Sequence, residues 1–82
     1  MKSTDKKIVS LTNLPYNKEA RIIRFEGGYG LNKRLRVIGI KEGGVIKIIS
    51  RQLLRGPLTI EVNSCQITLG RGMAQKIIVE VI

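Results

Sequence analysis

Residues 58–69, LTIEVNSCQITL, carry the clearest structural pattern in the sequence. On either side of Asn63 and Ser64, every second residue is apolar, which matches the alternation of side chains along a β-strand. Asn and Ser are both typical of tight turns. The stretch therefore predicts a two-stranded hairpin, and it places Cys65 inward as a small buried hydrophobic residue.

Runs of Ile and Val on both sides of this hairpin predict three further strands, at residues 20–25, 45–50 and 77–81. A short apolar segment at 8–14 precedes them, and residues 70–76 have room for at most one helical turn. Turns or connections are expected at 16–19, 41–44 and 51–57. Closing so few strands on themselves hides unpaired strand edges. The sequence thus predicts a mainly β fold, a small SH3-like barrel of about five strands with one short inserted α-helix and a one-turn helix before the last strand.

The inserted helix is predicted at residues 30–38, where the spacing of apolar residues changes. Leu31, Leu35 and Ile38 lie on one side of a helix, while Lys33 and Arg36 fall on the other side. Arg34 flanks the apolar stripe, and Gly39 supplies the left-handed residue that commonly closes a helix. Because so short a helix is unstable alone in water, we expect it to dock on the sheet through this stripe.

The length of 82 residues accommodates one domain. We expect residues 1–7 to be a flexible N-terminus, since they lack apolar anchors, and residues 8–82 to form a single domain. The basic N-terminal segment contains no continuous apolar run, so no signal peptide is predicted. No stretch approaches the roughly 20 apolar residues needed to span a bilayer. These features together predict a cytoplasmic protein.

The composition narrows the possible chemistry. There is no histidine and a single cysteine, so the chain can form neither an internal disulfide nor a Cys/His metal site. The Walker pattern is absent, and both G-x-G sequences lack the third glycine of the dinucleotide fingerprint. The acidic residues are scattered, with no pair placed to share a proton: Asp5, Glu19, Glu26, Glu42, Glu61 and Glu80. We therefore expect neither an enzyme nor a bound metal or cofactor.

The formal charge of +9 favours an anionic partner. An acidic protein face, nucleic acid and an anionic membrane surface all meet this condition, and the basic residues are dispersed along the whole chain. Nucleic-acid binding remains an alternative, although single-strand binders usually offer several stacking aromatic residues. This chain has three aromatics, Tyr16, Phe25 and Tyr29, and Phe25 is expected in the core.

Three segments together resemble the FeoA family, ferrous iron transport protein A: GGYGLNKRLRVIGIKEGGVIKI, GPLTIEV and ITLGRGMAQKIIV. The resemblance runs from about Leu11 to Val81. Its more specific elements are Gly27-Gly28, Arg34-Leu35, Gly39-Ile40 with Gly43, Gly56-Pro57, Leu69-Gly70, and Ala74 with Ile77 and Val79. Asn63-Ser64 stands where the family commonly has a glycine, and Gly72 is a weaker helix former than the family usually has.

The resemblance implies an SH3-like barrel that acts as a cytosolic accessory to the ferrous iron transporter FeoB, a membrane protein with a G-protein domain. We expect the contact to be made by the inserted helix and its lead-in, although this helix could also serve only to cover the barrel. The candidate partner-binding residues are Tyr29, Leu31, Asn32, Lys33, Arg34, Arg36 and Arg71.

Overall fold

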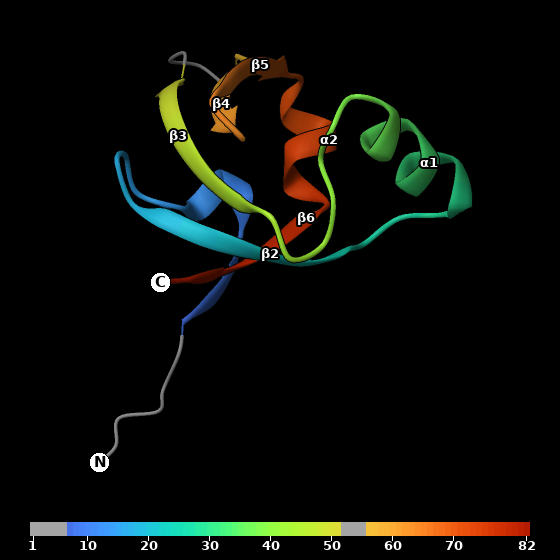
Figure 1. Ribbon diagram of the computed structural model, residues 1–82, viewed down its shortest axis with the longest axis horizontal. Coiled ribbons are helices and arrows are strands. Elements are labelled where there is room, and N and C mark those ends of the chain that lie inside the picture. The colour runs from blue at the N-terminus through green and yellow to red at the C-terminus, as the bar shows by residue number, and fades with distance from the viewer. Residues whose placement is uncertain (1–6, 52–55) are drawn as a thin grey trace.

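The computed structural model describes residues 7–51 and 56–82. Within them, six strands form one antiparallel sheet in the order β1-β6-β2-β3-β4-β5 (Figure 1). The strands are β1 (Ile8–Ser10), β2 (Glu19–Phe25), β3 (Val45–Arg51), β4 (Leu58–Val62), β5 (Cys65–Leu69) and β6 (Ile77–Val81). The helices are the 3-10 helix η1 (Leu11–Asn13), α1 (Tyr29–Val37) and α2 (Arg71–Gln75). Apart from Lys7, the N-terminus predicted to be flexible lies outside the described residues, as do residues 52–55 of the predicted connection.

The predicted fold class is confirmed: the chain is mainly β, with the arrangement of a small SH3-like barrel. α1 is inserted after β2, and the one-turn helix α2 precedes the last strand. The strands β4, β5 and β6 begin and end at the predicted residues. β2 begins one residue earlier than predicted, and β3 ends one residue later.

β1 is a strand that the sequence pattern does not predict. It has three residues, and all of them pair with β6 at the other end of the chain, with Ile8 opposite Glu80 and Ser10 opposite Ile78. The partner strand therefore specifies β1, because three residues are too few to show an alternating pattern of their own.

The turn between β4 and β5 has the geometry that a tight hairpin requires. Asn63 and Ser64 both have positive φ angles, 53° and 66°. Two consecutive left-handed residues match the right-handed twist of the flanking strands. The predicted hairpin is therefore confirmed, even though neither turn residue is glycine.

The core is aliphatic and lies inside the curved sheet. β4 shows the pattern most clearly, because Leu58, Ile60 and Val62 are buried while the residues between them are partly exposed. Irregular pairing interrupts β2 after Ile22 and β3 after Ile48, and such bulges bend a sheet toward closure. The remaining buried hydrophobic residues are Leu11, Leu14, Ala20, Ile22, Leu35, Ile40, Ile46, Ile48, Leu69, Ala74, Ile77 and Val79. Phe25 is partly buried against this core, as expected.

The prediction that Cys65 is buried is wrong, because this side chain is exposed. β5 is the last strand of the sheet and pairs with β4 alone. Of its three apolar positions, Leu69 is buried and Ile67 is partly buried. The burial of apolar side chains along this edge strand therefore decreases toward the turn at residues 63–64. The alternation of apolar residues in the sequence does not indicate this decrease.

Candidate partner-binding site

α1 stands at one end of the molecule, beside the sheet rather than within it (Figure 1). Its first turn begins at Gly28, whose carbonyl accepts hydrogen bonds from the amides of Leu31 (3.1 Å) and Asn32 (3.2 Å). Gly27, just before it, lies close to the side chain of Leu31: a Cβ atom at position 27 would overlap Cδ2 of that leucine. Gly27, one of the two glycines predicted to precede the helix, thus allows Leu31 to pack closely against the chain where it leaves β2.

The C-terminal end of α1 is closed as predicted. Gly39 has a φ of +97°, and its amide donates to the carbonyl of Arg36 at 3.0 Å. The amide of Ile40 donates to the carbonyl of Leu35 at 2.8 Å. This pair of hydrogen bonds defines a Schellman motif, in which the residue after the glycine packs against the last turn. Consistent with this motif, Leu35 and Ile40 are both fully buried.

The apolar stripe of α1 differs from the prediction at one position. Leu35 is fully buried and Leu31 is partly buried against the core, as expected. Ile38 was expected to complete the stripe, but 39% of its surface is exposed. The chain turns at Gly39 immediately after it, so Ile40 takes the buried place instead.

The outward face of α1 carries both cationic and apolar side chains. Tyr29, Lys33 and Val37 follow one another at intervals of four, and Arg36 lies beside them, so the four share one face of the helix. Tyr29 is 83% exposed and Val37 is 78% exposed, and the two cations are exposed as well. We call these four residues the crest of α1. Val37 was not among the predicted site residues, although its distance of eight residues from Tyr29 could have placed it on this face.

The other predicted site residues lie off the crest. Leu31 and Arg34 line a surface hollow of about 300 Å³ together with Gly30. Asn32 is partly buried, and its Oδ1 atom has no hydrogen-bond partner within residues 7–51 and 56–82. We call Leu31, Asn32 and Arg34 the flanks of α1. Arg71 is on a separate element, since it begins α2, which packs against η1.

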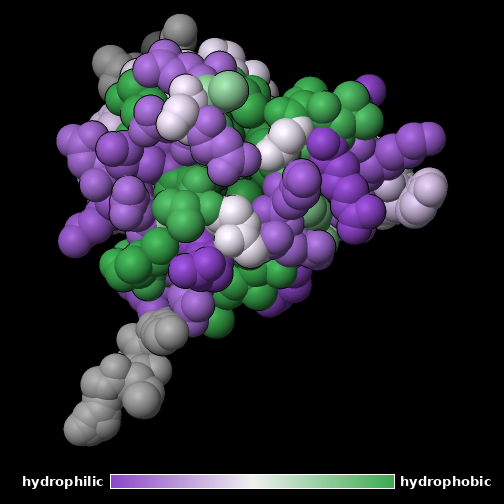
Figure 2. All heavy atoms as spheres, in the orientation of Figure 1, coloured by the Kyte–Doolittle hydropathy of each residue, from purple (hydrophilic) through white to green (hydrophobic). Residues whose placement is uncertain are grey.

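The charge around α1 has one sign. From residue 27 to residue 41 the sequence contains four cations, Lys33, Arg34, Arg36 and Lys41, and no acidic residue. In the part of the chain that the structure describes, neither of the two ion pairs involves them, because these pairs are confined to the strands and their ends. Figure 2 shows hydrophilic side chains gathered over the end of the molecule where α1 lies, with hydrophobic atoms next to them.

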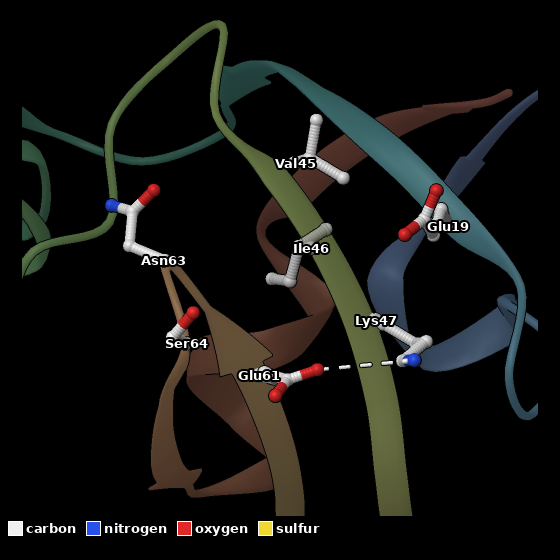
Figure 3. Close-up of a pocket in the computed structure, with 7 residues that line it drawn as sticks. All are labelled: Glu19, Val45, Ile46, Lys47, Glu61, Asn63 and Ser64. Atoms are coloured by element: carbon white, nitrogen blue, oxygen red, sulfur yellow. Dashed lines mark ion pairs between the residues drawn. The ribbon is translucent and has the colours of Figure 1, made fainter.

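A second hollow, of about 270 Å³, lies over β2, β3 and the β4–β5 turn (Figure 3). The charged residues of this hollow lie next to one another and partly neutralise each other. Lys47 Nζ lies 3.8 Å from a carboxylate oxygen of Glu61, and Glu19 is opposite Lys47 in the strand register. Among the described residues, no group of three or more His, Cys, Asp or Glu side chains is placed to hold a metal ion. We find no arrangement for chemistry in this hollow, and α1 remains the candidate site.

The fold and its surface therefore define the class of protein: a small SH3-like sheet domain with a projecting basic helix. A model of the FeoA domain matches residues 9–81, nearly the whole chain. The chain belongs to the FeoA family.

Individual relatives agree with this assignment. The chain is 36% identical over 63 residues to a putative Fe(2+) transport protein A of Methanocaldococcus jannaschii, a match that spans 77% of this chain and 74% of the relative. A crystal structure described as the iron uptake regulatory protein FeoA superposes with a TM-score of 0.85 at 21% identity, covering 93% of this chain and all of the other. Iron(II) transport protein A from Clostridium thermocellum superposes with a TM-score of 0.84 at 31% identity, covering 90% of this chain and 46% of that one.

Proposed function

We propose that this protein is a cytosolic accessory of ferrous iron transport that acts by contact with the cytoplasmic region of a FeoB-type transporter. Membership of the FeoA family and the name of the archaeal relative support the link to ferrous iron. The contact changes the behaviour of the transporter, and the protein itself catalyses no reaction.

The donor atoms of the chain support a role in contact rather than in carrying iron. There is no histidine, and the single cysteine stands exposed on the edge strand β5. Two carboxylates, Glu19 and Glu61, line the same hollow, and Lys47 lies between them in the strand register. A cation between two carboxylates opposes the binding of another cation, so we assign iron to the transporter.

The observation that carries the proposal is the projecting helix α1 (Figure 1). Among the described residues, its cations form no ion pair and one buried polar atom on its flanks has no hydrogen-bond partner. A buried amide oxygen without a partner is costly, and an incoming donor relieves that cost. Asn32 Oδ1 is such an atom, and the hollow beside Leu31 and Arg34 is large enough for a side chain of a partner. We therefore assign the transporter contact to the flanks of α1, with Arg71 at its margin.

Pull-down with the lipid-free cytoplasmic region of the transporter tests this assignment. The Arg34→Glu/Arg71→Glu variant should bind at least about tenfold more weakly than the wild type, because both charges are reversed within the contact. The Lys7→Glu/Lys18→Glu variant is the matched control, since it carries the same change in net charge at two exposed positions, just before β1 and β2 and away from the end of β2 that leads into α1. Equal binding by the two variants would remove this surface from the proposal, and a wild type that does not bind would contradict the proposed function.

A further inference from the structure

The crest of α1 is unusual in its exposure of apolar surface. Among the described residues, the two most exposed large hydrophobic side chains are Tyr29 and Val37, and both stand on this face. An isolated exposed hydrophobic residue needs no explanation, but two of them on one projecting helix turn the surface into a candidate docking site. The proposed transporter contact uses the flanks and leaves this face uncovered.

Charge and apolar surface alternate on the crest. Lys33 lies between Tyr29 and Val37 along the helix face, and Arg36 lies beside them. The nearest acidic residues in the sequence are Glu26 and Glu42, and Glu26 is already paired with Arg24 at 2.8 Å. No carboxylate on α1 therefore repels an anionic surface.

We propose that the crest of α1 docks on the anionic headgroup layer of a lipid bilayer. Tyr29 and Val37 enter the boundary between headgroups and acyl chains, while Lys33 and Arg36 bind lipid phosphates with their long side chains. Tyrosine suits this depth because its ring is apolar and its hydroxyl is polar.

A bilayer accounts for the crest better than nucleic acid does. Phosphates of nucleic acid would satisfy the cations but would leave Val37 exposed to water or facing charge, since its side chain can neither stack nor form a hydrogen bond. A bilayer offers anions at its surface and apolar volume directly beneath. α1 stands at one end of the molecule (Figure 1), so its crest can reach such a surface without a matching cavity.

The proposal stands independently of the transporter contact. If both hold, the crest keeps the protein at the leaflet next to which the cytoplasmic region of the transporter lies, while the flanks of α1 remain free to bind it. The binding to lipid is weak and reversible, because four side chains supply it.

Single-tryptophan variants test where the protein meets lipid. The natural chain has no tryptophan, so the emission of Tyr29→Trp reports position 29 alone. With vesicles of phosphatidylcholine and phosphatidylglycerol in equal amounts, we expect a blue shift for Tyr29→Trp and none for Tyr16→Trp, whose site is a half-exposed tyrosine away from α1. Absence of a shift at position 29 while the protein sediments with these vesicles would overturn the proposal, because it would place the contact elsewhere.

Co-sedimentation with the same vesicles measures the contributions of the crest. Each cation near an anionic membrane contributes a factor of roughly five, so Lys33→Gln/Arg36→Gln should weaken binding about 25-fold. The control Lys7→Gln/Lys18→Gln removes equal charge at two exposed positions outside the crest and should weaken vesicle binding markedly less. Val37→Ser should weaken vesicle binding by roughly fivefold and leave the lipid-free pull-down unchanged, which separates this proposal from the proposed function.

Two results would reject the bilayer as the partner. The first is a wild type that sediments no better with phosphatidylglycerol vesicles than with pure phosphatidylcholine. The second is binding to a labelled oligonucleotide that matches vesicle binding in strength, combined with a Val37→Ser variant that binds vesicles normally. That combination would identify the crest as a surface for any polyanion.

Discussion

Gly39 determines how α1 ends, through a backbone conformation that other residues adopt with difficulty. Its φ of +97° lets the chain reverse so that Ile40 packs on the core next to Leu35. A Cβ atom at this position would meet no other heavy atom within 4 Å. The requirement for glycine is therefore conformational rather than steric.

The Gly39→Ala variant isolates this conformational term. We expect its free energy of unfolding to fall by about 1–2 kcal/mol, the usual cost of forcing a side chain into the left-handed region. Gly30→Ala is the matched control, because position 30 also has open space but lies within α1, where alanine is a better helix former by up to about 1 kcal/mol. Urea denaturation of both variants measures the difference, and equal stability would contradict the role given to Gly39.

At the scale of the element, α1 depends on its docking for stability. It has nine residues, its N-cap residue Gly28 has no side chain to cap the helix, and its first turn contains no acidic residue. A helix this short is marginal in isolation, so burial of Leu35 supplies much of what holds it in place. The crest can then be presented at a fixed angle from the sheet.

The Leu35→Ala variant should detach α1. We expect a loss of about 2–5 kcal/mol in the free energy of unfolding, as for other buried leucines, together with faster amide exchange over residues 29–37. Val37→Ala serves as the control on the same helix, since Val37 is 78% exposed and its truncation should change stability by less than about 0.5 kcal/mol. Unchanged exchange in Leu35→Ala would show that the helix is held by other contacts.

The sequence predicts those elements whose signals are local. The hairpin at 58–69 follows from alternation around two turn residues, and the helix with its closing glycine follows from a change of spacing. The errors concern features set by distant parts of the chain. β1 forms because β6 is available to pair with it, and Cys65 is exposed because β5 has a single neighbour.

Burial at the end of α1 is another feature that local sequence spacing does not predict. Ile38 fits the helical stripe by spacing alone, but the stripe ends where the chain turns, and Ile40 occupies the core instead. For the site, the sequence indicated that α1 is basic on its outer side. The spacing of eight residues also places Val37 on the side of Tyr29, but an amphipathic helix is recognised by its inward apolar stripe, to which Val37 does not belong.

At the scale of the whole molecule, charge works against compactness. A formal charge of +9 on 82 residues repels itself, and the described residues contain two ion pairs to offset it. In each pair, more than one-third of the side-chain surface is exposed, averaged over the two partners. Such exposed ion pairs contribute little to the free energy of unfolding. The excess positive charge attracts the molecule to anionic surfaces, and we expect the same charge to lower its stability.

Salt should therefore stabilise the isolated protein. Raising the ionic strength from about 0.01 M to about 0.15 M shortens the screening length from about 30 Å to about 8 Å, and we expect the melting temperature to rise by a few degrees. Lys33→Gln/Arg36→Gln should show a smaller rise because it carries less charge. Thermal melts followed by circular dichroism measure both, and a melting temperature that falls with salt would mean that attraction between charges outweighs repulsion.

The pairing of β1 with β6 has a consequence for how this domain can be combined with other chains. The amide of Val81 donates to the carbonyl of Lys7 at 2.8 Å, so the two ends of the described chain run side by side. A linker of a few residues could join them into a ring, and the domain could equally be grafted into a surface loop of a host protein without stretching either end. Because α1 stands beside the sheet, at the other end of the molecule from the C-terminus (Figure 1), such a graft would leave its outer face accessible.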